Sequence, residues 1–165
     1  MQVFGIVGWS GSGKTVLVEK LIARFVACGI GVSTIKHAHH AFDIDRPGKD
    51  SYRHRQAGAQ EVMVASRARV AMVRELRGAP EPTLDELLAR LIPVDLVLVE
   101  GFKFAHHAKL EVHDPALGRP PLCRDDPHVV ALACPPPAPA VAIPAFDRDD
   151  DAAIAAFVLA RTGLG

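Results

Sequence analysis

Residues 8–15 read Gly8-Trp9-Ser10-Gly11-Ser12-Gly13-Lys14-Thr15, the complete G-x-x-x-x-G-K-[S/T] pattern of a phosphate-binding loop. An apolar run at residues 3–7 precedes this stretch, and an amphipathic stretch follows it. Strand, loop and helix in that order are the context in which the motif binds phosphate. The sequence therefore predicts a P-loop that holds a nucleoside triphosphate or a close relative.

Each part of the loop has a chemical role in this prediction. Its glycines let the backbone curl, so that successive N–H groups point inward at a helix N-terminus and form an anion-binding nest. We expect Lys14 to reach the β- and γ-phosphates and to support catalysis, and the Thr15 hydroxyl to join the coordination shell of Mg²⁺. The residues that we assign to nucleotide binding here are Gly8, Trp9, Ser10, Gly11, Ser12, Gly13, Lys14 and Thr15.

The rest of the chain alternates between strand and helix patterns. Helical spacing of apolar residues predicts a helix over 14–28, and a strand follows at 31–35, which completes a βαβ unit with parallel strands. Further strands are expected at 95–100, 109–113, 129–133 and 141–143, a hairpin at 61–65 and 69–73, an exposed loop at 114–127, and a final helix that begins among aspartates. We predict one domain over residues 1–165, an α/β P-loop NTPase fold with a mostly parallel, doubly wound sheet.

Candidate site residues lie where these strands end, because ligands of open α/β sheets bind at the carboxyl ends of the strands. Glu100 ends the apolar strand expected at 95–100. We predict that its carboxylate contacts Mg²⁺ directly or through water, or orients an attacking water. A carboxylate that only caps the turn before Gly101 is the alternative.

The polar stretch 36–50 is expected to be a switch or substrate loop. Its aspartates are candidates to complete the Mg²⁺ shell, its lysines to counter phosphate charge, and His37 to contact phosphate; solvated side chains are the alternative for each. These residues are Lys36, His37, Asp43, Asp45, Lys49 and Asp50. A transition-metal site built from histidines at 37, 39, 40, 106 and 107 is conceivable, but their spacing is not typical of one.

The sequence does not specify which residues recognise the nucleotide base, since the chain lacks the N-K-x-D segment of regulatory GTPases. Asp147 is a candidate acceptor for the guanine edge, as is the Asp125–Asp126 pair. Asp147 could equally cap the final helix. Trp9 could pack over the nucleotide or a partner, or be exposed. The residues themselves leave GTP and ATP both open.

Composition narrows the class of protein. The 165 residues include 19 basic and 19 acidic side chains, so the charge gives no argument for nucleic acid as a partner. No apolar stretch approaches the roughly 20 residues that span a bilayer, and the first residues resemble a core strand more than a signal peptide. The three cysteines are far apart and odd in number, which favours reduced thiols. We expect a cytoplasmic protein that acts away from membranes.

Nearly the whole chain resembles the MobB family of GTP-binding proteins of molybdopterin-guanine dinucleotide biosynthesis. The P-loop alone is generic, but the motifs that follow it in order are more specific. They are Thr34-Ile-Lys36-His37-x-His39-His40, Asp43-x-Asp45-x-Pro47-Gly48-Lys49-Asp50-Ser51, Arg53-His54 with Gln56-Ala57-Gly58-Ala59, and Glu100-Gly101-Phe102-Lys103. The run at 135–139 and its neighbours match no motif of the family.

The resemblance implies a P-loop protein of the class that includes signal-recognition and nitrogenase-type (SIMIBI-like) nucleotide switches. It implies a homodimer that binds GTP with Mg²⁺, hydrolyses it weakly, and assists the MobA-like guanylyltransferase that joins GMP to molybdopterin, with molybdopterin itself as a further possible ligand. Thr15 and Glu100 would then serve Mg²⁺. The residues that would line the same cleft are Lys36, His37, Asp45, Asp50 and Lys103.

Two alternatives from other classes remain. A small-molecule kinase shares the loop, the Mg²⁺ ligands and the fold, and Arg119 and Arg124 in the loop at 114–127 could serve as its basic lid residues. A binding module without turnover would use the loop to sense a nucleotide or to hold a phosphorylated pterin. Transfer of phosphate to an added acceptor favours the kinase, and pterin binding without nucleotide binding favours the module.

Overall fold

The computed structural model describes residues 1–38 and 42–165, so the expected roles of His39 and His40 lie outside the described residues. The chain divides into two compact units. The first contains Met1–His37 and Leu87–Gly165, and the second contains Ala38–Glu86. We describe each unit by itself, and the assignment of all 165 residues to one domain stays a prediction beside this division.

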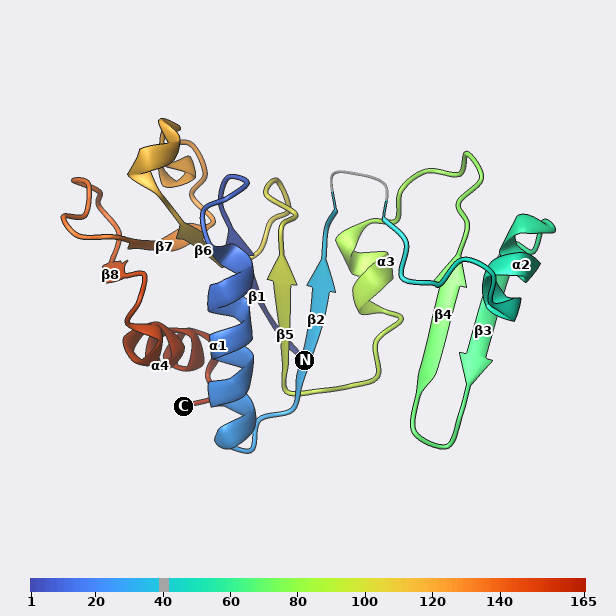
Figure 1. Ribbon diagram of the computed structural model, residues 1–165. Coiled ribbons are helices and arrows are strands. Elements are labelled where there is room, and N and C mark those ends of the chain that lie inside the picture. The colour runs from blue at the N-terminus through green and yellow to red at the C-terminus, as the bar shows by residue number, and fades with distance from the viewer. Residues whose placement is uncertain (39–41) are drawn as a thin grey trace. The chain divides into compact units, whose positions relative to one another are not determined.

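A six-stranded parallel sheet forms the centre of the first unit (Figure 1). Its strands lie in the order β2-β5-β1-β6-β7-β8. The chain thus adds β2 and β5 on one side of β1, and then β6, β7 and β8 on the other side. This is the doubly wound order, and it confirms the predicted fold class. The strands are β1 (Gln2–Val7), β2 (Val32–Lys36), β5 (Leu96–Glu100), β6 (Lys109–Val112), β7 (Val129–Cys134) and β8 (Ala145–Asp147).

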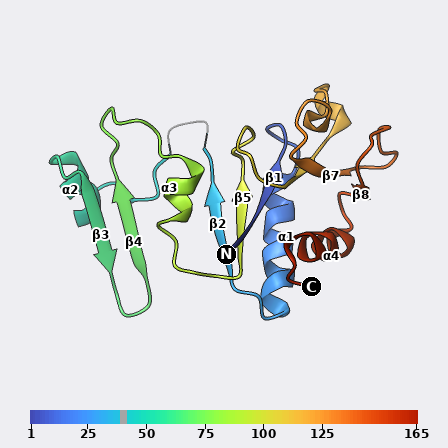
Figure 2. The ribbon, with the colours of Figure 1, turned by 180° about the vertical axis from the view of Figure 1, so that it is seen from behind.

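Two helices, α1 (Lys14–Ala27) and α4 (Asp151–Thr162), pack side by side on the sheet. Alternate strand residues such as Phe4 and Leu98 meet Leu21 of α1 and Ile154 of α4, and all four side chains are fully buried. The 3.6-residue period of α1 and the two-residue period of the strands therefore meet in one core, as the sequence pattern predicts. Figure 2 shows the same strands from behind, with β2 beside β5.

Polar side chains are buried on β6, which the sequence pattern did not predict. Lys109 is fully buried, and its Nζ donates to the carbonyls of Lys103 and Ala105 and to Asp126. Glu111, also fully buried, accepts from the backbone N–H groups of residues 122 and 123. Buried charges persist only when they are paired and hydrogen-bonded. These two side chains thus tie the segments after β5 and before β7 to the sheet.

The described structure corrects two local predictions. The last strand is β8 (Ala145–Asp147) and not 141–143, because β8 is the segment that pairs with residues 132–134 of β7. An edge strand is located by its partner, which the local pattern does not contain. The loop expected at 114–127 contains two short 3₁₀ helices, η1 (Pro115–Leu117) and η2 (Leu122–Arg124).

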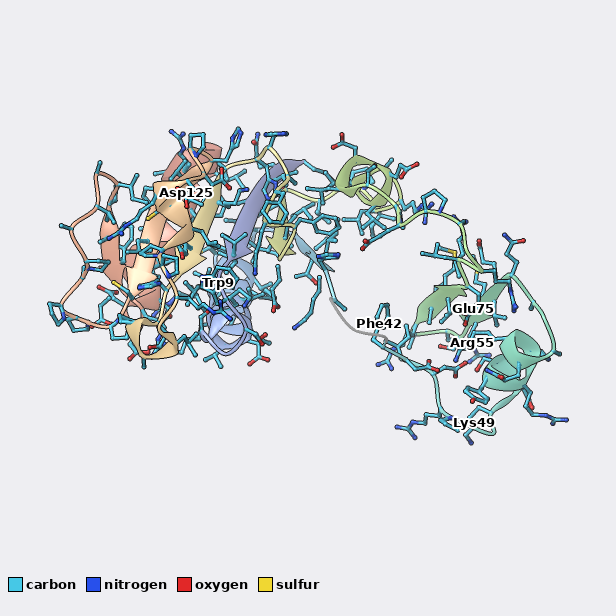
Figure 3. The ribbon with its side chains drawn as sticks, turned by 90° about the horizontal axis from the view of Figure 1, so that it is seen from above. Trp9, Phe42, Lys49, Arg55, Glu75 and Asp125 are labelled. Carbon is cyan, nitrogen blue, oxygen red and sulfur yellow. The ribbon has the colours of Figure 1, made fainter. Side chains whose placement is uncertain are left out.

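The second unit contains α2 (Asp50–Gln56) and an antiparallel hairpin of β3 (Glu61–Ala65) and β4 (Val70–Arg74), which confirms the predicted hairpin. A further helix, α3 (Leu84–Leu88), spans the boundary of the two units. The unit is organised by Arg55, whose buried guanidinium pairs with Asp43, Asp45 and Glu75 (Figure 3). In the described residues, none of the helices has the length and apolarity to cross a membrane.

Candidate nucleotide-binding site

The loop between β1 and α1 has the backbone conformation of a phosphate cradle. Gly8 has a φ of 146° and Gly13, at the N-cap of α1, a φ of 94°. These values are open to glycine and strained for other residues. A Cβ on Gly8 would lie 2.3 Å from the carbonyl oxygen of Val112 on β6, so that position also requires the absence of a side chain. The loop therefore sits at the switch point of the sheet, beside β6.

Lys14 is held along the loop by a hydrogen bond from its Nζ to the carbonyl oxygen of Trp9, at 2.8 Å. Burial lowers the pKa of Lys14, although the Glu100 carboxylate nearby opposes this shift. The positive charges of Lys103 and Lys36 act in the same direction as burial. Three cations thus gather around one carboxylate at this loop, an arrangement that suits a highly charged anion such as a triphosphate.

Thr15, Lys36 and Glu100 meet at the carboxyl ends of the strands. The Thr15 hydroxyl donates to Oε1 of Glu100 at 2.9 Å, and Nζ of Lys36 lies 3.0 Å from the same oxygen. Nζ of Lys36 also donates to Oγ1 of Thr15 at 3.3 Å. Strand register explains the meeting, because Lys36 and Glu100 are direct partners in the pairing of β2 with β5.

These donors fit Mg²⁺. The ion prefers oxygen ligands and is commonly held by one or two protein oxygens together with substrate phosphates and water. A hydroxyl and a carboxylate 2.9 Å apart at the start of α1 provide such a pair. For transition metals, no group of three or more histidine, cysteine, aspartate or glutamate side chains in residues 1–38 and 42–165 is suited to hold an ion.

The turn after Glu100 positions His37 and Lys103. Gly101 and Phe102 both have positive φ, 94° and 49°, and the Phe102 ring lies 4.8 Å from the His37 ring, centroid to centroid. The backbone N–H of His37 donates to the Glu100 carbonyl at 2.9 Å. The turn then directs Lys103 back to the P-loop, where its Nζ lies 4.4 Å from the centre of the Trp9 ring. His37 therefore lies beside Glu100, and Lys103 lies at the Trp9 ring of the P-loop.

Trp9 is half-buried between two cations. One cation is Lys103, and the other is Arg119, whose guanidinium carbon lies 5.3 Å from the centre of the Trp9 ring. The indole N–H donates to the carbonyl of Pro120 at 3.1 Å. Aromatic faces attract cations in this way. The Trp9 side chain thus connects the P-loop with the segment before η2.

A cavity of about 320 Å³ adjoins the P-loop and the start of α1. It is lined by Gly11, Gly13, Val16, Lys20, Asp114 and Arg148, among others. Arg148 donates to the carbonyl of Ser12 at 3.2 Å and to Asp114 at 3.1 Å. Arg148 and Asp114 were not predicted from the sequence. Asp114 directly follows the strand expected at 109–113, a place where such sheets bind ligands, whereas Arg148 follows β8, whose bounds the local pattern did not predict.

The two guanine-recognition candidates have different surroundings. Asp147 is exposed at the end of β8, directly before Arg148, and accepts from the backbone N–H of Asp149 at 3.0 Å. It does not cap the final helix, because Asp150 does so by accepting from Ala153. Asp125 is exposed, whereas Asp126 is bound to Lys109 and to the backbone of His128.

Asp45 and Asp50 belong to the second unit, so their expected roles at the phosphates stay predictions. Asp45 accepts from Ser51 at 2.9 Å and from Arg55 at 3.3 Å. Burial acts to raise the pKa of Asp45, but these hydrogen bonds and that of the Arg46 backbone outweigh it and lower the pKa. Asp50 is exposed in the first turn of α2.

Comparison with known proteins agrees with this architecture. The family model for molybdopterin guanine dinucleotide synthesis protein B, MobB, matches residues 3–135. The molybdopterin-guanine dinucleotide biosynthesis adapter protein of Escherichia coli K12 is 43% identical over 136 residues, which cover 81% of this chain and 78% of that protein. The adapter protein of Haemophilus influenzae is 42% identical over 136 residues, 81% of this chain and 74% of its own.

A crystal structure of molybdopterin-guanine biosynthesis protein B superposes with a TM-score of 0.77 at 26% identity, over 98% of this chain and 99% of that one. The crystal structure of a MobB homologue from Bacillus stearothermophilus superposes with a TM-score of 0.70 at 26% identity and covers both chains fully. Sequence motifs, fold and all three comparisons agree, and the chain belongs to the MobB family, the molybdopterin guanine dinucleotide synthesis protein B.

Proposed function

We propose that this protein binds GTP with Mg²⁺ at the P-loop, hydrolyses it slowly, and assists the attachment of GMP to molybdopterin. Family membership carries the coarse role, that of an adapter in molybdopterin guanine dinucleotide biosynthesis. The observation that supports the finer role is the convergence of Lys14, Thr15 and Glu100 at one loop.

Each residue has a definite task in this proposal. The N–H groups of the loop and the ammonium of Lys14 hold the β- and γ-phosphates. Thr15 and Glu100 hold Mg²⁺, which when bound neutralises phosphate charge. Lys103 and Lys36 add positive charge beside Lys14. The cavity beside Arg148 and the exposed Asp147 provide room and an acceptor for the base.

Calorimetric titration with Mg·GTP and, separately, Mg·ATP tests the proposal. Tighter binding of GTP is the expected result, because the Asp147 carboxylate can accept from the N–H groups of guanine and finds no matching pair on adenine. Equal binding of both nucleotides, or preference for ATP, would contradict the guanine-specific part of the proposal. Absence of binding would overturn the proposal as a whole.

Replacement of Thr15 by alanine is expected to weaken Mg·GTP binding about tenfold, since one metal ligand is lost. The fold should persist, because the hydroxyl is part-buried and its hydrogen-bond partners in residues 1–38 and 42–165 are Glu100 and Lys36 alone. Titration of GTP in the presence of Mg²⁺ and in EDTA measures the effect, which should appear only with the metal. Unchanged affinity for Mg·GTP would remove Thr15 from the metal site.

Partners and assembly are part of the proposal. We infer a MobA-like guanylyltransferase as the partner, molybdopterin as a possible ligand, and the cytoplasm, where the three free cysteines stay reduced, as the compartment. A homodimer is supported by the hairpin of the second unit, which exposes Met63, Val64, Val70 and Met72. Light scattering at the 17.7 kDa mass of one chain would contradict the homodimer.

A small-molecule kinase remains a second candidate on one observation. Arg119 lies against Trp9 of the P-loop, where it could act as a basic lid residue. Arg124 is exposed on η2. Incubation with Mg·GTP or Mg·ATP and candidate acceptors separates the two functions. Phosphate found on an acceptor supports the kinase, and free phosphate alone supports the slow hydrolase.

A further inference from the structure

Lys36 lies between the two oxygen donors of the expected metal site. Its Nζ is 3.0 Å from Oε1 of Glu100 and 3.3 Å from Oγ1 of Thr15, and these two oxygens are themselves 2.9 Å apart. All three residues belong to the first unit. A single cationic atom therefore contacts both oxygens that would hold Mg²⁺.

The Glu100 and Lys36 side chains differ in burial. The Glu100 side chain is 11% exposed and the Lys36 side chain 57%. A carboxylate taken out of water is costly unless a positive charge accompanies it. Lys36 provides that charge from the neighbouring strand, where Lys36 and Glu100 are register partners. Its exposed, flexible stem leaves it free to move, while Glu100 stays in place.

From this geometry we propose that Lys36 is a built-in counter-ion, whose ammonium contacts the two oxygens that would hold Mg²⁺ and competes with the metal for them. The proposal deepens the function proposed above and rests on Thr15 and Glu100 as metal ligands. When a divalent cation enters, the Lys36 ammonium leaves the two oxygens and turns toward the solvent or the phosphates. Lys36 is thus a regulatory residue that offsets the Glu100 charge when no metal is bound and lowers the affinity of the site for free metal.

The experiment uses Mn²⁺ alone on the full-length, nucleotide-free protein, with free Mn²⁺ measured by electron paramagnetic resonance. The variant Lys36→Met keeps the length of the stem and removes the charge. It is expected to bind Mn²⁺ about tenfold more tightly than the unmodified chain, because it loses a competing charge in contact with both ligands. Lys36→Arg, which keeps the charge, should bind Mn²⁺ as the unmodified chain does.

Lys103→Met is the matched control, because Lys103 also adds positive charge near Lys14 but contacts the Trp9 ring and not Glu100. It should change Mn²⁺ affinity less than Lys36→Met does. The double variant Lys36→Met with Glu100→Gln should lose the gain, since the carboxylate that binds the metal is gone.

Several outcomes would overturn the proposal. They are Mn²⁺ affinity of Lys36→Met equal to or weaker than that of the unmodified chain, no Mn²⁺ binding by either protein, and an equal gain in Lys103→Met. The alternative role of Lys36, a plain phosphate ligand, predicts no gain for free metal and weaker GTP binding with and without Mg²⁺. Because the Mn²⁺ readout contains no nucleotide, failure to bind GTP would count against the proposed function only.

Discussion

Replacement of Lys14 by alanine is expected to weaken Mg·GTP binding by about 100-fold or more. The side chain is the one cation of the P-loop motif itself, and charge-assisted hydrogen bonds to phosphate are about twice as strong as neutral ones. The structure already places its Nζ along the loop, 2.8 Å from the carbonyl of Trp9. Calorimetric titration of the variant with Mg·GTP measures the loss.

The fold of the Lys14→Ala variant should be retained, since the lost contact is one hydrogen bond in a partly buried loop. Arg161→Ala, which removes an exposed cation from α4, is the control and should bind GTP normally. Binding within a few-fold of the unmodified chain would rule out Lys14 as a phosphate ligand. Loss of GTP binding with retained binding of a phosphorylated pterin would favour a pterin-binding module.

Replacement of Gly8 by alanine is expected to lower the free energy of unfolding by about 3 kcal/mol or more. The new Cβ would lie 2.3 Å from the Val112 carbonyl and 2.8 Å from Oγ of Ser12, at a φ of 146°. The first neighbour is backbone of the central strand β6 and cannot move aside cheaply. Denaturant unfolding followed by circular dichroism measures the change, and GTP binding should fall with it.

Gly29 offers the matched comparison, because it has a positive φ of 79° but, among the described residues, no atom within 4 Å of an added Cβ. Gly29→Ala should therefore lower the free energy of unfolding only by the cost of placing an alanine at positive φ, about 1 kcal/mol. The difference between the two variants isolates the steric contact with β6. Equal losses in both variants would show that the approach of Val112 to Gly8 does not matter for stability.

Much of the fold was predictable from local signals. Helix α1, the strands β1, β2, β5 and β7, and the hairpin in the second unit follow from apolar periodicity and from turn residues. Each of these patterns is contained in a contiguous segment. The expected strand at 141–143 was wrong for the opposite reason, since β8 is determined by the backbone of β7 with which it pairs.

The site residues also divide into those that local sequence predicts and those that it does not. Residues 8–15 are contiguous, and glycines at fixed positions in this segment specify the loop conformation. The sequence by itself therefore determined the P-loop. Glu100 was predicted because it ends an apolar strand, Lys36 and His37 because they lie in the polar stretch 36–50, and Lys103 through the family motifs. Arg148 and Asp114 had no such motif and were missed.

Tertiary structure alone decided which charges meet. Lys36 and Glu100 are 64 positions apart in the chain, and only the register of β2 against β5 makes them neighbours. Lys109 and Glu111 read as ordinary polar residues of an alternating strand, yet both are buried because loop carbonyls and N–H groups converge on them. The sequence by itself determined the phosphate loop and the family, because both depend on contiguous residues. The pairing of strands decided the electrostatics of the site, because charge interactions depend on distance in space.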